Sequence, residues 1–448
     1  VLIQIKDGFW HPHRLAQGVL WSRMRPAEEI MQTRHVVIIG AGPAGLCLAL
    51  ALAQQGMQVD VIERQGADAL AEPGFDGREI ALTHASMRLL RTLGVWQHIA
   101  EDEISPIRRA CIMDGARAHF TVDGTALGHD HLGTLVSNHI IRAAAWKAVT
   151  AQARIRVHAD ARVESVSCQG DFASAHLGDG KELRAPLLVA ADSRFSEARR
   201  GMGIPAHMHD FGKSMLVCRM QHDASTAGTA WEWFGNGMTR ALLPLGEHLS
   251  SVVLTLPDAE AQALMRLSAE DFAREVTTHY EGRLGSMSLA STIHRYPLVA
   301  TWSRRFVGPR FALAGDAAVG MHPVTAHGFN LGLASVEHLA QAAGDGWRRH
   351  GDPGDAALLA RYQRRHRMSS APMFAGTQLL LGVFTGPHAF LRPLRRVVMS
   401  AGSRVPALRR ALAANLVDDG PRPASLARHL RVALGVLRPR LGPARPHA

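Results

Sequence analysis

Cysteine is scarce in this sequence, and its spacing excludes several classes of protein. The 448 residues include only four cysteines, at positions 47, 111, 168 and 218, each 50 or more residues from the next. No CxxC or CxH pair occurs, so the spacing expected of a zinc site is missing. Widely separated single cysteines are typical of a reducing cytoplasm. We therefore expect a cytoplasmic protein that binds no metal.

Long apolar runs are also missing, although apolar residues make up 47% of the chain. The longest stretch without a polar side chain, residues 36–53, is interrupted by three glycines and a proline, so an ordinary membrane-spanning helix is not expected there. Charged residues are only 20% of the total, which argues against general disorder. The composition therefore predicts a folded protein with a large core, built from two or three structural units.

Lysine is rare as well: only four of the 50 basic residues are lysines, and the rest are arginines. Arginine binds phosphate and stacks on flat rings, although a GC-rich genome would produce the same bias. The net charge is +11, of which residues 403–448 carry +7 through nine arginines and two aspartates. Such a basic end can lie on an anionic membrane, or it can pack on the core with a solvated arginine face. We expect a peripheral membrane contact and no nucleic acid, because no nucleic-acid-binding module is recognised.

Residues 1–33 differ from the rest of the chain. They show no clear periodic pattern and no basic-then-apolar arrangement of a signal peptide. A pattern typical of a folded domain begins at Arg34. We therefore expect an extension that is disordered or that reflects a start placed too early.

A strand–turn–helix pattern opens the predicted fold. Residues 36–39 form a short, charge-free, β-branched run, as expected of a central parallel strand. The sequence GAGPAG follows at residues 40–45 and matches GxGxxG. A helical pattern then covers residues 46–55, and a second strand at residues 59–62 ends at Glu63. This context makes the motif a strong sign of a dinucleotide site, either NAD or FAD.

Each residue of the motif has a physical role in such a site. Gly40 permits the tight turn, Gly42 lets the backbone approach a pyrophosphate, and Gly45 lets helix and strand pack closely. The amides at the helix N-terminus attract phosphate, and Glu63 can accept hydrogen bonds from a ribose diol. We add to the cofactor-binding candidates the neighbouring Pro43, Ala44 and Arg64.

A second motif points to the identity of the nucleotide. The strand-like run 310–314 leads into Gly315-Asp316, and His322-Pro323 and then residues 326–330, AHGFN, follow. This order resembles the second flavin signature of the para-hydroxybenzoate hydroxylase-like flavoprotein monooxygenases. The resemblance implies FAD, with Gly315 and Asp316 at the ribityl chain and with Gly328 and Asn330 at a helix start that faces the flavin. His327 stands where the family usually has glutamine, Ala326 replaces a glycine, and Val319 replaces a histidine.

Further segments resemble the same family. An apolar strand at residues 187–191 precedes Asp192, which the resemblance implies in nucleotide binding, although Ser193 replaces the usual glycine. The segment DGREIAL at residues 76–82 and the later Asn138 resemble the branch of ubiquinone-biosynthesis hydroxylases, and they imply Arg78 and Asn138 as FAD contacts. Alternatives stay open for these residues: Arg78 as a surface arginine, and Asn138 as a loop cap.

The resemblance implies a complete reaction cycle. NADH or NADPH reduces FAD, the reduced flavin adds O2 to give a 4a-hydroperoxide, and the distal oxygen attacks an electron-rich aromatic carbon, most simply that of a prenylated phenol in ubiquinone biosynthesis. We expect an apolar pocket that excludes water. The catalytic candidates are His322, Pro323 and His327, as the environment of flavin and substrate. His322 can equally be a core histidine, and no general base is apparent.

Other functions remain possible at this stage. They include hydroxylation of another aromatic metabolite, a polyprenyl reductase, a halogenase, or an FAD-bearing scaffold in a biosynthetic complex. Halogenases need a lysine near the first flavin element and a WxWxIP strand. Here Trp231 and Trp233 are present, but no Ile-Pro follows and no lysine lies between residues 7 and 146. These absences count against halogenation.

The predicted fold class is α/β. A Rossmann-like FAD-binding domain is interleaved with an α+β substrate domain that carries a mixed β-sheet, and C-terminal helices follow. We expect the FAD-binding domain at 34–105, 137–205 and 301–345, the substrate domain at 106–136 and 206–300, and a helical region with a basic tail at 346–448.

Overall fold

The computed structural model describes residues 34–114, 117–125, 128–235, 238–322 and 327–385. The expected extension at residues 1–33, the basic tail and Pro323 lie outside the described residues. Among the residues that are described, we find no helix with the length and apolar character needed to cross a membrane.

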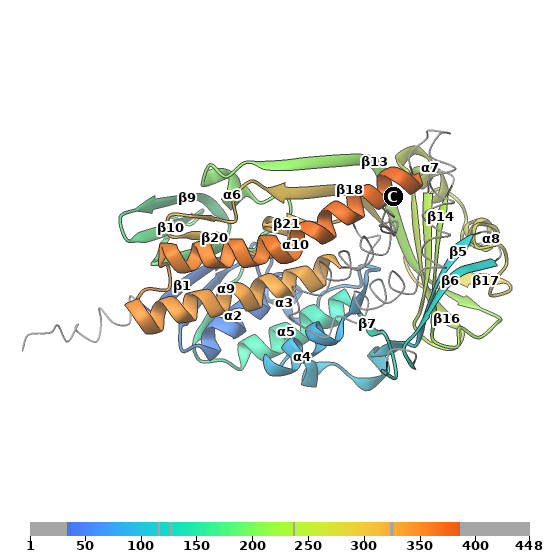
Figure 1. Cartoon of the computed structure of the whole chain (residues 1–448), viewed down its shortest axis with the longest axis horizontal. Coiled ribbons are helices and arrows are strands. Elements are labelled where there is room, and N and C mark those ends of the chain that lie inside the picture. The colour runs from blue at the N-terminus through green and yellow to red at the C-terminus, as the bar shows by residue number, and fades with distance from the viewer. Residues whose placement is uncertain (1–33, 115–116, 126–127, 236–237, 323–326, 386–448) are drawn as a thin grey trace, which may run out of the picture.

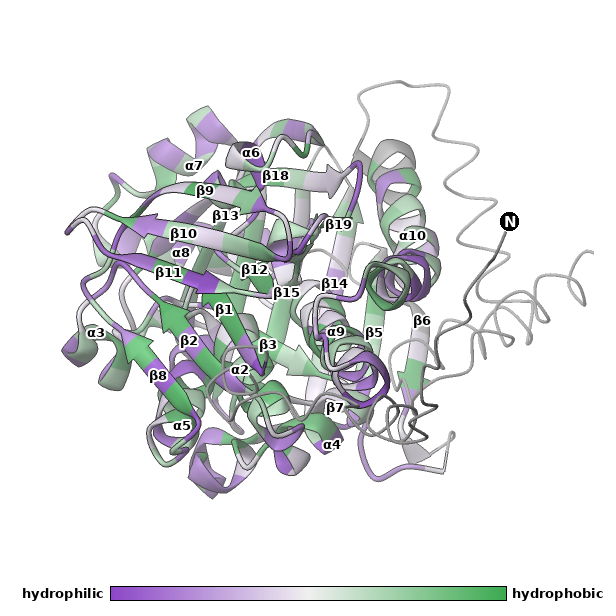
Figure 2. Ribbon diagram, turned by 90° about the vertical axis from the view of Figure 1, so that its left-hand side faces the viewer, coloured by the Kyte–Doolittle hydropathy of each residue, from purple (hydrophilic) through white to green (hydrophobic). Residues whose placement is uncertain are grey.

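A six-stranded sheet forms the nucleotide-binding part of the molecule. Its strand order is β19-β20-β12-β1-β2-β8, and every neighbouring pair is parallel except β19 with β20. Figure 2 shows β1, β2 and β8 side by side. The charge-free sequence of the central strands suits burial on both faces. The strands are β1 (His35–Ile39), β2 (Gln58–Ile62), β8 (Ile155–His158), β12 (Leu187–Ala190), β19 (Val307–Gly308) and β20 (Phe311–Leu313).

Helices cover one face of this sheet, and a small antiparallel sheet covers the other. Helix α2 (Pro43–Gln54) lies between α5 (Asn138–Thr150) and α9 (Gly328–His350), as Figure 1 shows. The small sheet has the order β11-β10-β9, and its apolar side chains join the same core as β1 and β12. Its strands are β9 (Val163–Gln169), β10 (Phe172–Leu177) and β11 (Glu182–Ala185).

A nine-stranded sheet forms the second part of the molecule, with the order β21-β18-β13-β16-β15-β14-β5-β6 and β17 paired with β13. Helices α7 (Asp258–Leu264) and α8 (Ala269–His279) accompany it, and α8 packs an apolar core against one face. The strands are β5 (Arg109–Asp114), β6 (Arg117–Asp123), β13 (Ala206–His222), β14 (Thr229–Gly235), β15 (Met238–Pro244), β16 (Leu249–Pro257), β17 (Met287–Leu289), β18 (His294–Ser303) and β21 (Val319–Gly320).

A third antiparallel sheet, β3-β7-β4, contacts β15 of the nine-stranded sheet through β4 and helix α9 through β3. Helix α10 (Ala356–Thr385) contacts α9 and β19 and then reaches β14 of the large sheet, and it runs along the molecule in Figure 1. The remaining elements are α3 (Ala67–Ala71), β3 (Glu79–Leu82), α4 (His84–Thr92), η1 (Trp96–His98), η2 (Glu101–Glu103), β4 (Ser105–Ile107), β7 (Gly133–Ser137), α6 (Glu197–Gly201) and η4 (Gly315–Ala317).

These arrangements confirm the predicted fold class. The predicted strand at residues 36–39 is β1, the predicted helix at 46–55 is α2, and the second strand at 59–62 is β2. Strands from residues 109–123 and 206–303 build the nine-stranded sheet together with β21. The domain boundaries that we drew around these segments stay a prediction.

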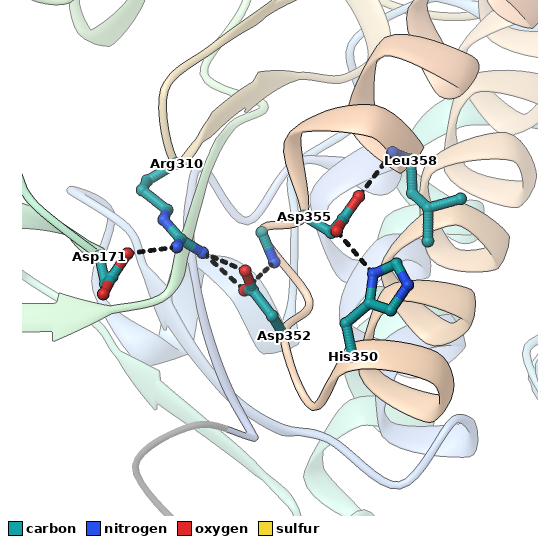
Figure 3. Close-up of polar contacts among 7 residues, drawn as sticks. Asp171, Arg310, His350, Asp352, Asp355 and Leu358 are labelled. Atoms are coloured by element: carbon teal, nitrogen blue, oxygen red, sulfur yellow. Dashed lines mark hydrogen bonds and ion pairs between the residues drawn. The ribbon is translucent and has the colours of Figure 1, made fainter.

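A group of ion pairs fastens the turn between α9 and α10 to the six-stranded sheet (Figure 3). The Arg310 guanidinium, just before β20, donates to both carboxylate oxygens of Asp352 at 2.6 Å and to Asp171 at 2.7 Å. Beside it, Asp355 accepts from the backbone N–H of Leu358 at 2.9 Å and contacts His350 at 2.6 Å. The turn is therefore held by charged side chains rather than by apolar packing alone.

Candidate functional site: the nucleotide cavity

The turn between β1 and α2 needs glycine at two positions for steric reasons. Gly40 has a φ of +106°, and a Cβ there would lie 2.6 Å from the Ala191 carbonyl oxygen. A Cβ on Gly45 would lie 1.9 Å from the carbonyl oxygen of Gly40. A Cβ on Gly42, by contrast, would meet nothing within 4 Å, and Gly42 lines a cavity. The turn therefore leaves open space at the N-terminus of α2, where backbone amides attract phosphate.

The end of β2 supplies a carboxylate to the same cavity. One oxygen of Glu63 accepts from the backbone N–H of Ala41 at 2.7 Å, and the other accepts from the backbone N–H of Gln65 at 3.0 Å. These bonds fix the carboxylate beside the glycine turn. Glu63 and Arg64 both line the cavity. The expected contact of Glu63 with a ribose and the cofactor-binding role of Arg64 stay predictions, and the structure adds that Glu63 also holds the turn.

The second motif reaches the cavity from β20. Gly315 has a φ of +59°, and its N–H donates to the Ser335 hydroxyl of α9 at 2.8 Å. The next residue, Asp316, lines the cavity and accepts from Arg194 at 2.8 Å, while Arg194 also donates to the carbonyl of Val299 at 2.9 Å. Sequence reasoning did not assign a role to Arg194. The only signal was its place two residues after Asp192.

Helix α9 begins at the cavity. His327 stands at its N-cap, and His327, Gly328 and Asn330 all line the cavity. The Asn330 side chain accepts from the backbone N–H of Thr83 at 3.1 Å and donates to the carbonyl of Ala81 at 2.8 Å. Asn330 therefore holds the start of α9 against β3. Two helix N-termini, those of α2 and α9, open into one cavity.

Arg78 and Asn138 come together on one carboxylate that sequence reasoning left without a role. Arg78 donates to Asp76 at 2.6 Å, and the Asn138 amide donates to it at 2.7 Å. Burial opposes ionisation of Asp76, but these hydrogen bonds outweigh it and hold the pKa of the Asp76 carboxyl below its usual range. The Tyr296 hydroxyl of β18 donates to the Asp76 carbonyl at 2.6 Å. The predicted pair is thus fixed at the junction of the two large sheets, and both residues line the cavity.

Asp192 follows β12 and lines the cavity as well. Burial raises the pKa of its carboxyl. One oxygen accepts from the backbone N–H of Ala198 at 3.3 Å, whereas the other is buried with no hydrogen-bond partner among the described residues. A buried oxygen of this kind costs free energy unless a ligand hydroxyl or amine satisfies it. Together with the open space at Gly42, it shows that these residues fit a bound dinucleotide.

The cavity itself has a volume of ≈ 2400 Å³. Typical single-ligand pockets measure about 300–1,000 Å³, so it has room for a dinucleotide and a second molecule. One wall carries the predicted cofactor residues. The facing wall is the nine-stranded sheet, through mainly apolar side chains such as Met215, Val217 and Val253. Gly45 does not line the cavity, because it packs α2 against the turn.

His322 lies apart from these walls. Its side chain is 2% exposed, its ring packs edge-on against Phe211 with 4.8 Å between centroids, and it is not among the described residues that line the cavity. Burial, with the nearby charges of Lys213 and Arg194, lowers the pKa of the His322 imidazole to about 3. This packing supports the alternative of a neutral core histidine. The catalytic roles of His322 and of the cavity residue His327 stay predictions.

Metal ligands do not gather anywhere in the part of the chain that the structure describes, where no group of three or more His, Cys, Asp or Glu side chains has a suitable arrangement.

Comparison with known proteins agrees with this geometry. A protein family described as FAD binding domain matches residues 33–373. Over 93% of this chain and 91% of the relative, the sequence is 42% identical to the ubiquinone hydroxylase UbiM of Neisseria meningitidis. It is also 34% identical to the ubiquinone hydroxylase UbiL of Rhodospirillum rubrum, over 88% of this chain and 92% of the relative.

Among solved structures, p-nitrophenol 4-monooxygenase from Pseudomonas putida shares the fold. The TM-score is 0.68 at 19% identity, and the match covers 86% of this chain and 98% of that one. The expected cofactor, FAD, is confirmed. The chain therefore belongs to the FAD binding domain family, as an FAD-dependent monooxygenase.

Proposed function

We propose that this protein hydroxylates the aromatic ring of a ubiquinone precursor, using O2, NAD(P)H and FAD. Two relatives that match most of the chain, at 42% and 34% identity, are named ubiquinone hydroxylases. The observation that carries the proposal is the shape of the cavity. A nucleotide-binding wall faces an apolar wall across one space of ≈ 2400 Å³, so an aromatic substrate can lie against the cofactor.

The two walls of the cavity have different roles: one binds the cofactor, and the other excludes water. The amides at the start of α2 and the Asp316 carboxylate would hold the dinucleotide, and the start of α9 would lie beside its ring system. When bound, FAD accepts electrons from NAD(P)H and activates O2. The apolar side chains of the nine-stranded sheet keep water from the reacting atoms, which strengthens the electrostatic interactions there and prevents side reactions.

Two measurements test the proposal. The purified protein should be yellow, and a prenylated phenol should stimulate its oxidation of NADH or NADPH by several-fold and yield a product with one more oxygen. A strain that lacks the gene should accumulate a prenylphenol with one hydroxyl fewer. A colourless protein that takes up no FAD would contradict the proposal, and unchanged quinones in the strain would remove the ubiquinone precursor as substrate.

We further propose that residues 403–448, which lie outside the described residues, bind an anionic membrane surface. Their net charge of +7 favours anionic lipid, in which a prenylated substrate would dissolve. Removing the residues after Ser403 should weaken sedimentation with vesicles containing phosphatidylserine while the protein keeps FAD. Equal sedimentation of the full and shortened chains would contradict this idea. A biosynthetic complex, the other expected partner, would appear as proteins that co-purify with the full chain.

A further inference from the structure

Strand β14 places one carboxyl group in an otherwise apolar setting. Trp231 and Trp233 are buried in the core between the nine-stranded sheet and α8. Because side chains alternate along a strand, Glu232 points to the opposite face, and it lines the large cavity. The sequence pattern WEW thus reflects a strand with one face in the core and one face toward the substrate space.

The register of the sheet defines the surroundings of Glu232. Its direct neighbours across the sheet are Ile112 on β5 and Ala241 on β15. The same row continues through Val253 on β16 to Val217 on β13. All four neighbours line the cavity with Glu232, so Glu232 is the one ionisable side chain among these five residues. The row ends on β18 at His294, which does not line the cavity.

The cavity-lining residues of the two adjacent rows are uncharged, and Arg219, which continues one of these rows on β13, pairs with Glu79 at 2.9 Å and does not line the cavity. On the same face, the two rows contain the cavity-lining residues Met215, Thr255, Thr239 and Phe234 on one side and Ala110, Ala230 and Leu243 on the other. Glu232 therefore lies in the middle of a patch that is suited to an aromatic ring and an apolar tail.

Charged groups on the elements that pack against β14 do not reach Glu232. On β5, Arg109 pairs with Asp123, and on β15, Arg240 packs over Trp233 on the far face of the sheet. In α10, Arg361, Arg364 and Arg365 line the cavity, whereas the later segment from Ser369 to Thr385 contains no charged residue.

Across the cavity, two of the charged residues that line it have partners of their own. Arg78 is paired with Asp76, and Asp316 is paired with Arg194. The Glu232 carboxyl thus has no hydrogen-bond or ion-pair partner among the described residues. Burial alone raises the pKa of the Glu232 carboxyl to about 8.

We propose that Glu232 binds the ring hydroxyl of the aromatic substrate and accepts its proton during hydroxylation. This inference rests on the proposed function, because it assigns the contact for that same substrate. A half-buried carboxyl without a protein partner is unfavourable among apolar side chains, and a substrate hydroxyl in the cavity would satisfy it. A general base works best when its pKa lies near the working pH, and Glu232 meets that condition.

The proton step is balanced without a further reagent. The Glu232 carboxylate accepts the proton of the ring hydroxyl, and the electron pair of that O–H bond stays on the ring oxygen. The phenolate is more electron-rich at its ring carbons than the phenol, so oxygen transfer to the ring is easier. The neutral carboxyl then returns its proton to water or product when the site opens.

The test compares Glu232→Gln with the unchanged protein on two probes, a phenol with one prenyl group and the methyl ether of that phenol. Glutamine keeps the size of the side chain and removes the titration. We expect kcat for hydroxylation of the phenol to fall about 100-fold, a typical contribution of a general base. In the unchanged protein kcat/KM should rise with pH and level off above about pH 8, and this rise should vanish in Glu232→Gln.

The methyl ether supplies a readout that a merely structural role would not change. The unchanged protein should prefer the phenol, whereas Glu232→Gln should treat phenol and ether alike, and Glu232→Asp should restore part of the preference. The matched control is Glu270→Gln on α8, an exposed carboxyl, which should keep both the rate and the pH profile. Retained FAD colour in each variant would show that it folds.

Two further outcomes separate the two proposals. If the unchanged protein hydroxylates the phenol and Glu232→Gln keeps its rate, pH profile and preference, the inference about Glu232 is overturned and the proposed function stands. If the unchanged protein binds FAD but hydroxylates no phenol or prenylated precursor, the proposed function fails first.

Discussion

Ser193 adopts a backbone conformation that suits glycine, with a φ of +112°. Ser193 follows Asp192 at the position where the related family has glycine. The replacement of glycine by serine therefore places a side chain at a backbone φ that side chains rarely adopt. A side chain at such a φ costs about 1–3 kcal/mol. The Ser193 hydroxyl recovers part of this cost by accepting from the backbone N–H of Phe195 at 3.3 Å.

Replacing Ser193 with glycine should therefore stabilise the protein. We expect a gain of about 1 kcal/mol in the free energy of unfolding, because the relief of strain exceeds the loss of one long hydrogen bond. Urea unfolding followed by fluorescence measures the change. Ser196→Gly is the matched control, since Ser196 caps α6 through the N–H of Arg199 at 2.9 Å and its loss should destabilise. A loss of stability in Ser193→Gly would show that the hydroxyl outweighs the strain.

At the scale of elements, α9 and α10 depend on the ion pairs at their shared turn. Arg310 is 18% exposed in its side chain, and its partner Asp352 is 27% exposed. The pKa of Arg310 is raised, since the hydrogen bonds and charges of Asp352 and Asp171 outweigh the opposing effect of burial. The α9 N-terminus lines the cavity, so this turn anchors the far end of a helix on which the flavin site depends.

Arg310→Ala should lower the free energy of unfolding by about 1–3 kcal/mol, because it leaves Asp352 partly buried without its partner. Differential scanning calorimetry measures the shift in Tm. Arg274→Ala provides the comparison, since Arg274 pairs with Asp271 at the surface and is 79% exposed. Such pairs contribute less than about 1 kcal/mol. Equal effects of the two substitutions would contradict the role assigned to the turn.

At the scale of the whole molecule, three of the buried histidines among the described residues have strongly lowered pKa values. Burial, with nearby positive charge, lowers the pKa of His322 and of His366 to about 3 and that of His338 to about 4. An unfolded chain protonates histidine below about pH 6.5, whereas the folded protein does not until the lower values. Stability is therefore fully present above pH 6.5 and is lost as the pH falls from 6.5 toward 4.

Each histidine contributes up to about 1.4 kcal/mol per pH unit to this loss. Carboxylates with lowered pKa values, such as Asp60 and Asp76, lose their stabilising contribution only below their unfolded pKa of about 4. The pH range of the histidine effect therefore lies above the pH range of the carboxylate effect. Urea unfolding between pH 7.5 and 5 measures the slope. His366→Phe should reduce this slope by up to about 1.4 kcal/mol per pH unit, because His366 is 1% exposed among apolar and aromatic rings. A slope unchanged by that substitution would contradict the assignment.

Local sequence determined the nucleotide half of this protein. The apolar strand, the glycine turn, the helix and the second strand follow local patterns, so their order along the chain already predicted β1, α2, β2 and a dinucleotide. The resemblance of the Gly315-Asp316 segment to a flavin signature implied that the dinucleotide is FAD. Gly45 is required by the turn itself, because its Cβ would meet the Gly40 carbonyl oxygen, whereas Gly40 is required both by its φ of +106° and by the distant Ala191 carbonyl.

The tertiary structure decided the substrate half. Parallel pairing of β14 with β5 joins residues more than 100 positions apart, and no local pattern contains that register. The sequence therefore showed Glu232 only as a polar residue between two tryptophans, and Asp76 only as part of a motif. Pairing across the sheet placed Glu232 in an apolar row facing the cofactor wall, and packing of the two sheets gathered Arg78, Asn138 and Tyr296 around Asp76. The burial and the electrostatic environment of a site depend on segments that are far apart in the sequence, so they are set only when the chain folds.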